Sequence, residues 1–376
     1  MHVKMLTPWR DRDGITDYAR ALTEELGHLA DVEIVPLESE FSDAVAHRMA
    51  TQLNRGDVVH IQHDTDDLGN WRTPARVWWF WRLLKQIRVP SVVTVHDLPP
   101  LLSMRRGNGP IKTIIYNGLI LPIVNWTPLG AFLRGGFLRP ARHVIVHSSD
   151  NVPVLATLTV PERNISVLYP GIPSLVASDF SIRDKYRLEG TKILAMFGFI
   201  APYKGIETAL EALQLLPKNH VLLIAGGIRS DYYRSYLEQL TRAIQASGLQ
   251  GRVVVTGYLD EPMVGAALAA ADAVLVSRKA SAITGGASYS LSYALAARRP
   301  VITSDLPFFC EIERGYSAVK TFPEGDAQAL ARTVLNVLEG DGGQPPEPEG
   351  AKRYREGWSW KSVAAKTYAI YERLLA

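Results

Sequence analysis

The sequence predicts an α/β protein made of two doubly wound units, each a parallel sheet covered by helices. Short apolar strands alternate with helical stretches along the chain, and the alternation restarts after Tyr169–Pro173, a segment that contains proline and glycine. The length of 376 residues agrees, because one domain usually takes roughly 100–200 residues. Apolar residues form 47% and charged residues 21% of the chain, which is ordinary for globular proteins and excludes long disorder or a coiled coil.

The first unit is expected to span residues 1–170. Short apolar runs predict its strands, which are His2–Leu6, Val32–Pro36, Val58–Gln62, Ser91–His96 and His143–His147. A helix is expected from about Ile15 to Leu29, and a short amphipathic helix over Val77–Lys85.

The second unit is expected to span residues 171–357. Its predicted strands are Lys192–Phe197, His220–Ala225, Val253–Thr256, Ala273–Val276 and Val301–Ser304. Its predicted helices are Ile206–Leu215, Asp231–Ser247, Glu261–Ala270, Tyr289–Ala297 and Ala327–Leu338. The segment Gly340–Gly350 is too rich in proline and glycine for regular structure. A last helix around Trp360–Leu375 is expected to return to the first unit, to which residues 358–376 then belong.

The net charge of +3 hides a strong asymmetry. Between Trp71 and Arg142 there are eleven basic residues and one acidic residue, so this window carries +10 and the rest of the chain −7. Five of the eight tryptophans also lie there. Cations with interfacial aromatics favour peripheral binding to an anionic membrane surface. The expected membrane-facing residues are Trp78, Trp79, Trp81, Arg82, Lys85, Arg105 and Arg106. The alternative is that the tryptophans fill the core of the first unit.

Cysteine use and hydropathy predict the location of the protein. Cys310 is the single cysteine, which excludes an intramolecular disulfide and Cys-rich metal sites and favours a reducing compartment. No secretory signal opens the chain, and the longest apolar stretch, Ile114–Trp126, falls short of the ~20 residues of a membrane-spanning helix. We therefore expect a cytoplasmic protein, peripheral on the inner face of the plasma membrane. Nucleic acid is not an expected partner, because no nucleic-acid-binding module accompanies the basic window.

A first candidate anion site follows the first strand. Gly14 precedes a helix start for which Thr16 or Asp17 is the expected cap, and the backbone N–H groups at such a start attract anions. Arg10 and Arg12 lie just upstream and favour contact with a phosphate or an anionic acceptor. The alternative is that Gly14 is only a turn residue.

A second candidate site follows the strand Lys192–Phe197. The next loop carries Lys204 to the carboxyl edge of the sheet, where ligands of open α/β sheets bind. A lysine at this edge neutralises a diphosphate as a point charge. The alternative is that Lys204 is a solvated surface residue.

A third candidate site is the glycine-containing loop before the helix that starts at Tyr289. Gly285 and Gly286 let a phosphate approach backbone N–H groups, and the helix dipole favours negative charge there. Arg278 and Lys279 lie near enough in sequence to add positive charge. The alternative is a plain loop.

Taken in order, these motifs resemble those of glycosyltransferase family 4, whose members are retaining enzymes with the two-domain GT-B fold. The resemblance covers nearly the whole chain. Its segments are Gly14 with Tyr18, the strand motif Val58–His63, the T-x-H-D strand end Val93–Asp97, the strand Val144–Ser148, the interdomain turn Tyr169–Ile172, the G-x-x-x-x-x-K-G motif Gly198–Gly205 and the A-x-A-x-G-x-P-V-I-x-S-like segment Ala294–Ser304.

The resemblance implies retaining transfer of a sugar from a UDP- or GDP-linked donor to a glycan or lipid-linked acceptor, with no metal and no cofactor besides the donor. The first unit is then the acceptor-binding domain and the second unit the donor-binding domain. His96 and Lys204 are the expected catalytic residues. The implied donor-binding residues are Gly14, Gly198, Lys204, Tyr258, Arg278, Lys279, Gly285, Gly286, Ala287 and Ser288. The implied acceptor- or anion-binding residues are Arg10, Arg12 and Asp97.

Three positions depart from the usual pattern of this family. Phe199 stands where an arginine is common, and Gly285 and Tyr293 stand where two glutamates are common. A catalytically silent GT-B protein that binds a nucleotide sugar or a partner is therefore an alternative function.

Two other chemistries are less favoured. Asp64–Asp67 contains an Asp-x-Asp pattern whose hard oxygen ligands suit magnesium or manganese, but a loop that caps a helix or turn explains it equally simply. A nicotinamide-dependent oxidoreductase is disfavoured, because no G-x-G-x-x-G follows the first strand of either unit.

Overall fold

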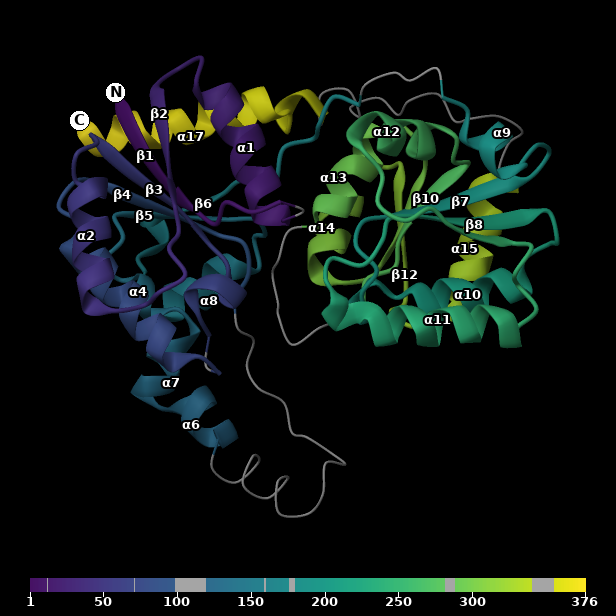
Figure 1. The fold of residues 1–376 in the computed structure, drawn as a ribbon, viewed down its shortest axis with the longest axis horizontal. Helices are drawn as coiled ribbons and strands as arrows, with labels where there is room; N and C mark the ends of the chain where they lie inside the picture. The colour runs from purple at the N-terminus through teal and green to yellow at the C-terminus, as the bar shows by residue number, and fades with distance from the viewer. Residues whose placement is uncertain are drawn as a thin grey trace. The chain divides into compact units, whose positions relative to one another are not determined.

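The computed structural model describes residues 1–11, 13–70, 72–98, 120–158, 160–175, 180–280, 288–339 and 355–376. Within these ranges the chain forms two compact units (Figure 1). Unit 1 comprises Met1–Gly171 and Trp360–Ala376, and unit 2 comprises Ile172–Ser281 and Ser288–Ser359. The chain thus leaves unit 1 inside the Tyr169–Pro173 segment, and its last helix is part of unit 1.

Unit 1 is built on a six-stranded parallel sheet in the order β2-β1-β3-β4-β5-β6. The strands are β1 (His2–Thr7), β2 (Asp31–Pro36), β3 (Val58–His63), β4 (Ser91–Val95), β5 (His143–Val146) and β6 (Ile165–Val167). Strands β3 and β4 are buried along their whole length, as expected where helices cover both faces of a parallel sheet. Their register sets Gln62 of β3 beside Thr94 of β4.

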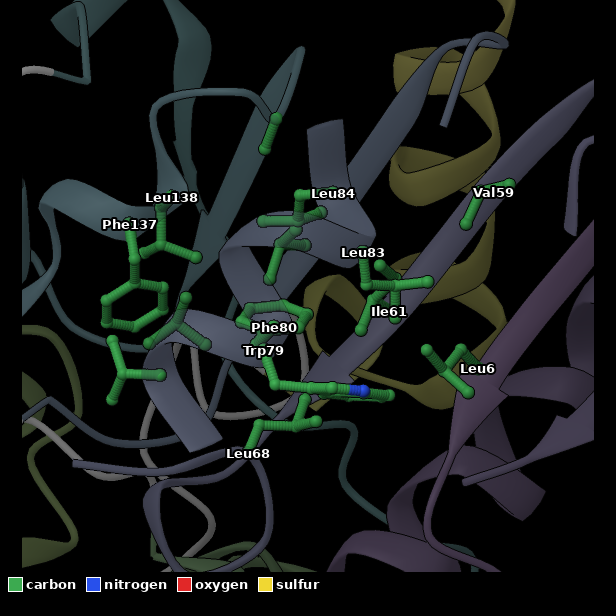
Figure 2. Close-up of a cluster of buried hydrophobic side chains, with 14 of the residues drawn as sticks. Leu6, Val59, Ile61, Leu68, Trp79, Phe80, Leu83, Leu84, Phe137 and Leu138 are labelled. Atoms are coloured by element: carbon green, nitrogen blue, oxygen red, sulfur yellow. The ribbon is translucent and has the colours of Figure 1, made fainter. Parts of the chain in front are cut away.

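Helices cover this sheet on both faces. Helices α1 (Gly14–Leu26) and α17 (Trp360–Leu375) pack together on one face, and α2 (Asp43–Leu53) and α4 (Pro74–Gln86) lie on the other (Figure 1). Figure 2 shows Phe80 and Leu83 of α4 in the buried cluster with Ile61 of β3. The shorter elements are α3 (Thr65–Leu68), α6 (Leu121–Trp126), α7 (Pro128–Arg134), η2 (Gly136–Leu138), α8 (Asn151–Thr157) and η3 (Glu162–Asn164).

Unit 2 is built on a second six-stranded parallel sheet, in the order β12-β11-β10-β7-β8-β9. Its strands are β7 (Lys192–Phe197), β8 (His220–Ala225), β9 (Val253–Val255), β10 (Ala273–Val276), β11 (Val301–Ser304) and β12 (Val319–Phe322). Helices α10 (Ile206–Leu215), α11 (Arg234–Ala246) and α15 (Ala327–Glu339) share one hydrophobic cluster on one face. Helices α12 (Glu261–Ala269), α13 (Tyr289–Ala296) and α14 (Pro307–Gly315) lie on the other (Figure 1). The remaining elements are α9 (Ile182–Tyr186), η4 (Pro202–Lys204) and η5 (Asp231–Tyr233).

The start of α1 differs from its prediction. The cap is Asp13, whose carboxylate accepts hydrogen bonds from the backbone N–H groups of Ile15 at 2.9 Å and Thr16 at 3.1 Å. The predicted caps, Thr16 and Asp17, were wrong, because Gly14 is already the first helical residue. A cap precedes the first helical residue, where its own backbone is extended.

Within the described ranges, no helix combines the length and the apolar composition that crossing a bilayer requires.

Candidate functional site

The sheet of unit 2 has a switch point between β7 and β10, from which the strand order runs outward in both directions. Ligands of open parallel sheets bind beyond the carboxyl ends of the strands at such a point. The loop after β7 contains Gly198 and Lys204, and the loop after β10 contains Arg278. Three predicted donor-binding residues therefore lie at one edge of one sheet.

The Lys204 side chain reaches from the β7 loop to helix α13. Its Nζ donates a hydrogen bond to Ser290 Oγ at 2.7 Å. Gly198, at φ +115°, leaves room for this contact, because a Cβ there would lie 2.9 Å from Ser290 Oγ and 3.2 Å from Lys204 Nζ. Sequence reasoning missed Ser290, since a serine inside a helix carries no signal of its own.

The Lys204 ammonium group lies beside a second cation. Burial, and then the positive charge of Arg278, lowers the pKa of Lys204 from 10.5 to about 7. Both cations lie over the ring of Tyr203, at 5.6 and 5.5 Å from its centroid. Of the ion pairs formed by described residues, none involves Lys204. An anionic ligand at this edge would compensate a charge that the surroundings of Lys204 oppose.

Gly205 fixes the place of Lys204. Its φ of +66° is left-handed, and a Cβ there would lie 1.7 Å from the carbonyl oxygen of Ser277. Ser277 Oγ donates to the carbonyl oxygens of Gly205 at 3.0 Å and of Lys204 at 3.3 Å. The Ser277 side chain thus ties the loop after β10 to the backbone of the loop after β7. The close approach of the Ser277 carbonyl oxygen is the steric reason for a glycine directly after the lysine.

Lys279 forms an ion pair within unit 2. Its Nζ lies 3.0 Å from Glu207 Oε2, in the first turn of α10. Glu207 also accepts a hydrogen bond from the Tyr236 hydroxyl at 2.7 Å. A carboxylate of the same unit thus compensates the charge of Lys279, and its contact with a donor stays a prediction.

The other donor residues predicted in unit 2 are Ser288, Tyr258 and the run Gly285–Ala287. Ser288 Oγ accepts from the Leu291 N–H at 3.2 Å, so its hydroxyl caps α13. Tyr258 follows β9 and is 58% exposed. Tyr293, at one of the departing positions, packs against Phe197 with ring centroids 4.7 Å apart. Gly285, Gly286 and Ala287 lie outside the described residues.

The switch point of unit 1 lies between β1 and β3. Arg10, after β1, donates to both oxygens of Asp67, after β3, at 2.6 and 2.5 Å. The predicted anion-binding charge of Arg10 is therefore already paired. No atom lies within 4 Å of a Cβ placed on Gly14, but the Asp13 carboxylate takes the N–H groups that the prediction offered to an anion. Arg12 lies outside the described residues.

His96 directly follows β4 and is only 8% exposed. Its Nδ1 lies 3.2 Å from His147 Nε2, its Nε2 lies 2.9 Å from Gln62 Oε1, and its ring meets Tyr18 edge-on at 4.7 Å. Burial, and then the neighbouring His147, lowers the pKa of His96 well below 6.5. The imidazole is therefore neutral at physiological pH.

The acidic residues after β3 and β4 hold helix α3. Both oxygens of Asp97 accept from Thr65, at 2.9 Å from its N–H and 2.7 Å from its hydroxyl, and contact of Asp97 with an acceptor stays a prediction. Asp64 accepts from the Asp66 N–H at 2.8 Å and caps α3. Burial, and then Asp97, raises the pKa of Asp64 well above its usual value. Among the described residues, no cluster of His, Cys, Asp and Glu suits a metal ion.

The predicted membrane-facing residues of α4 lie on two different faces. Trp79 is 3% exposed, and its indole N–H donates to the Ser42 carbonyl at 2.8 Å (Figure 2). Its prediction was wrong, because Trp79 belongs to the core. Trp78 is 52% exposed, and the partly buried Trp81 packs against Trp78 and Phe132 at 4.8 and 5.8 Å.

The cations of α4 are exposed, and so are two apolar side chains farther along the chain. Arg82 forms an ion pair with Asp43 at 2.6 Å, and the Lys85 ammonium lies 4.6 Å from the centroid of Trp81. Trp126, at the end of α6, is 71% exposed, and Leu129 of α7 is 58% exposed. Neither was among the predicted membrane-facing residues. Arg105 and Arg106, which were, lie outside the described residues.

Sequence comparison relates unit 2 to a known family. Residues 178–356, slightly less than half of the chain, match the family described as glycosyl transferases group 1. A phosphatidyl-myo-inositol mannosyltransferase of Mycolicibacterium smegmatis is 25% identical over 208 residues, 54% of this chain and 50% of that one. The corresponding protein of Mycobacterium leprae is 29% identical over 189 residues, 49% of this chain and 46% of that one. The chain thus spans about half the length of the curated relatives it matches.

Structure comparison covers nearly the whole chain. Anabaena HepE in complex with UDP superposes with a TM-score of 0.74 at 15% identity, over 99% of this chain and 100% of that one. Sucrose-phosphate synthase of Thermosynechococcus elongatus superposes with a TM-score of 0.72 at 17% identity, over 100% and 99%. The fold is the two-domain α/β GT-B fold, and the match of residues 178–356 confirms the predicted resemblance to glycosyltransferases.

Proposed function

From the match of residues 178–356 to the group 1 glycosyl transferases, we propose that this protein transfers a sugar from a nucleotide-diphosphate donor to an acceptor. The observation that carries the proposal is the Lys204 ammonium group beside Arg278, at the switch point of unit 2. The leaving diphosphate gains negative charge as its bond to the sugar breaks, and fixed cations in an enclosed site stabilise that charge. A UDP- or GDP-linked hexose is the proposed donor.

We also propose that the reaction needs no metal and retains the configuration of the sugar. Lys204 and Arg278 offer the diphosphate two positive charges. In other sites a divalent metal ion supplies this charge. His96, buried and neutral, offers a polar surface to an oxocarbenium-like sugar without opposing its charge. Retention is supported by the order of motifs from Gly14 to Ser304 that resembles a retaining family.

The proposed acceptor is linked to a lipid. The curated relatives are named for mannosyl transfer to phosphatidyl-myo-inositol. In this chain Trp78, Trp126 and Leu129 form an exposed apolar set on α4, α6 and α7, and we call it the α4–α7 apolar set. It lies within the basic window, whose cations complement anionic lipid. We propose that it rests on the inner face of the plasma membrane.

Replacing Trp126 and Leu129 together by alanine is expected to weaken binding to vesicles of phosphatidylcholine mixed with phosphatidylglycerol. Two half-inserted apolar side chains contribute about 2–3 kcal/mol, so the loss is about thirtyfold to 150-fold. Flotation of the protein with the vesicles measures it. Tyr232→Ala is the matched control, because Tyr232 is 81% exposed but lies in unit 2. Unchanged flotation of the double variant would remove the membrane proposal.

A screen of UDP-, GDP- and ADP-linked sugars by thermal shift tests the proposed donor. A ligand at a hundred times its Kd stabilises the folded state by about 2.7 kcal/mol, which a thermal scan detects easily. The same mixtures are then assayed for nucleoside diphosphate and glycosylated lipid. Binding with turnover supports the proposal, whereas binding without turnover supports the silent alternative suggested by Phe199 and Tyr293. No shift with any of these sugars would contradict the proposed donor and would leave only a silent protein that binds a partner.

A further inference from the structure

A chain of buried polar side chains crosses the sheet of unit 1. It joins His60 and Gln62 of β3 to His96, after β4, and His147, after β5. Their exposed fractions are 0, 1, 8 and 0%. Buried polar groups are almost always hydrogen-bonded. The partners of these four side chains therefore fix which ring nitrogens carry protons.

A backbone carbonyl next to His147 determines which ring nitrogens of His147 and His96 carry protons. His147 Nδ1 lies 2.6 Å from the carbonyl oxygen of Leu168, which can only accept, so Nδ1 carries a proton. The Nε2 of a neutral His147 is then an acceptor. It lies 3.2 Å from His96 Nδ1, so this nitrogen carries the proton of His96. His96 Nε2 is consequently an acceptor as well.

Gln62 must therefore donate to His96. Its side-chain amide lies against His96 Nε2, with Oε1 at 2.9 Å, and two acceptors do not bond to each other. Half a turn of the amide exchanges its oxygen and nitrogen in place. The amide nitrogen then donates to His96, and the oxygen takes the position 3.4 Å from His60 Nε2.

The hydrogen bonds of His60, at the other end of this series of side chains, agree with the same placement of protons. His60 Nε2 lies 2.7 Å from Thr94 Oγ1, and His60 Nδ1 lies 2.5 Å from the hydroxyl of Tyr371 on α17. With its proton on Nε2, His60 donates to Thr94 and accepts from Tyr371. All three linked imidazoles are then neutral. Burial favours this state, since it lowers the pKa of His60 to about 3 and of His147 to about 4.

The opposite orientation of Gln62 requires a buried cation. If its oxygen accepts from His96 Nε2, the hydrogen bond between His96 and His147 requires that one of these two histidines carry protons on both nitrogens. The titratable groups that face this pair are Tyr18, His60 and His63. In the described part of the chain, no carboxylate hydrogen-bonds to the linked imidazoles. A buried cation without a counter-charge is strongly disfavoured.

We propose that Gln62 and His147 are positioning residues that hold His96 as a neutral imidazole with its proton on Nδ1. This inference rests on the proposed function, because it states what His96 offers to the transferred sugar. Both ring nitrogens of His96 are bonded inside unit 1. His96 therefore acts as a fixed dipole and surface, and it moves no proton during the transfer.

Nitrogen-15 NMR of the full-length protein, labelled at histidine, tests the proton order without any substrate. The chain has nine histidines, and His96→Gln identifies the His96 signals by their loss. We expect a protonated Nδ1 and an unprotonated Nε2 on His96, unchanged between about pH 5.5 and 8.5. A proton on His96 Nε2, or a doubly protonated His147, would overturn the proposal.

His147→Leu and His147→Gln test positioning during turnover. Leucine removes the acceptor of the His96 proton, whereas glutamine keeps an acceptor near the same place. We expect kcat to fall about tenfold to a hundredfold with leucine, an effect of the size seen when a buried N–H loses its partner. The KM for the donor should stay unchanged, and glutamine should recover most of the loss. Equal kcat in the leucine variant and the unaltered protein would refute positioning.

Two outcomes keep the proposal separate from the proposed function. If the unaltered protein turns over no donor, the proposed function fails, while the NMR spectra still decide the proton order. If the leucine variant does not fold, the spectra of the unaltered protein and the kcat of the glutamine variant decide instead, and a glutamine variant with the His96 proton on Nε2 and full kcat would refute positioning.

Discussion

Lys204→Met is expected to abolish donor binding and to stabilise the protein at the same time. Removing one fixed donor that faces a developing anion costs about 10²–10³ in rate, and a comparable loss is expected in donor affinity. The free energy of unfolding should nevertheless rise by about 1–3 kcal/mol at pH 6, because methionine places no charge where the ammonium group is enclosed. Calorimetric titration with the donor and thermal unfolding followed by circular dichroism measure the two effects.

The pH dependence of this variant follows from the lowered pKa of Lys204. The folded protein has a pKa of about 7 there, against an ordinary value of 10.5, so the unfolded chain binds more protons between these values. The stability contributed by this group therefore rises as pH increases from about 7 to about 10.5. Lys204→Met should accordingly stabilise most at pH 6 and least near pH 10. Donor affinity of the unaltered protein should fall as pH increases above about 7.

Lys192→Met is the matched control for Lys204→Met. Lys192 stands at the amino end of β7, away from the switch-point edge, and pairs with Asp272 at 3.4 Å. Its loss should leave donor binding unchanged and alter stability by less than about 1 kcal/mol. Normal donor affinity in Lys204→Met would place the donor site elsewhere.

Gly205→Ala is expected to destabilise unit 2 by more than about 3 kcal/mol and to remove donor binding. A Cβ at this position would lie 1.7 Å from the Ser277 carbonyl oxygen, so the loop that carries Lys204 must move away from the end of β10. The left-handed backbone adds a further penalty of about 1–2 kcal/mol. Unfolding in urea, followed by circular dichroism, measures the loss.

Gly190→Ala separates the two causes. Gly190 has φ +69°, nearly that of Gly205, but no atom lies within 4 Å of a Cβ placed there. Only the backbone penalty of about 1–2 kcal/mol is expected, with donor binding intact. Seven of the eight tryptophans lie in the sequence of unit 1, so tryptophan fluorescence serves as an internal control that should hardly change. Equal destabilisation by both substitutions would mean that the contact with Ser277 does not hold the loop.

The sequence predicted the sheets well where strands are buried on both faces. Strand β8 reads as a nearly unbroken apolar run, which is typical of a buried parallel strand, whereas β3 is buried along its whole length although it contains two histidines and a glutamine. Strands β6 and β12 were missed, because β6 has three half-buried residues and β12 alternates buried and exposed positions. Helix α2 was also missed, although Ser42 before it accepts a capping hydrogen bond from the Val45 N–H. A systematic search for caps would have found it.

The donor edge was partly predictable and the membrane-facing surface less so. Lys204 and Gly205 form a local motif, whereas Ser290 reaches Lys204 from 86 positions away, and only the folded sheet brings them together. On α4, a helical projection places Trp78 with Arg82 and Lys85, at spacings of four and three, and sets Trp79 on the buried side. Composition alone treated the two tryptophans alike.

The central claim is that the edge holding Lys204 binds a sugar nucleotide for transfer. Its most direct test is one reaction of the purified protein with a labelled UDP- or GDP-hexose and lipid vesicles, in the presence of a metal chelator. We expect nucleoside diphosphate and glycosylated lipid in equal amounts, the anomeric configuration of the donor retained, and neither product from Lys204→Met. Full product formation by Lys204→Met, or no product from the unaltered protein with any donor, would contradict the account.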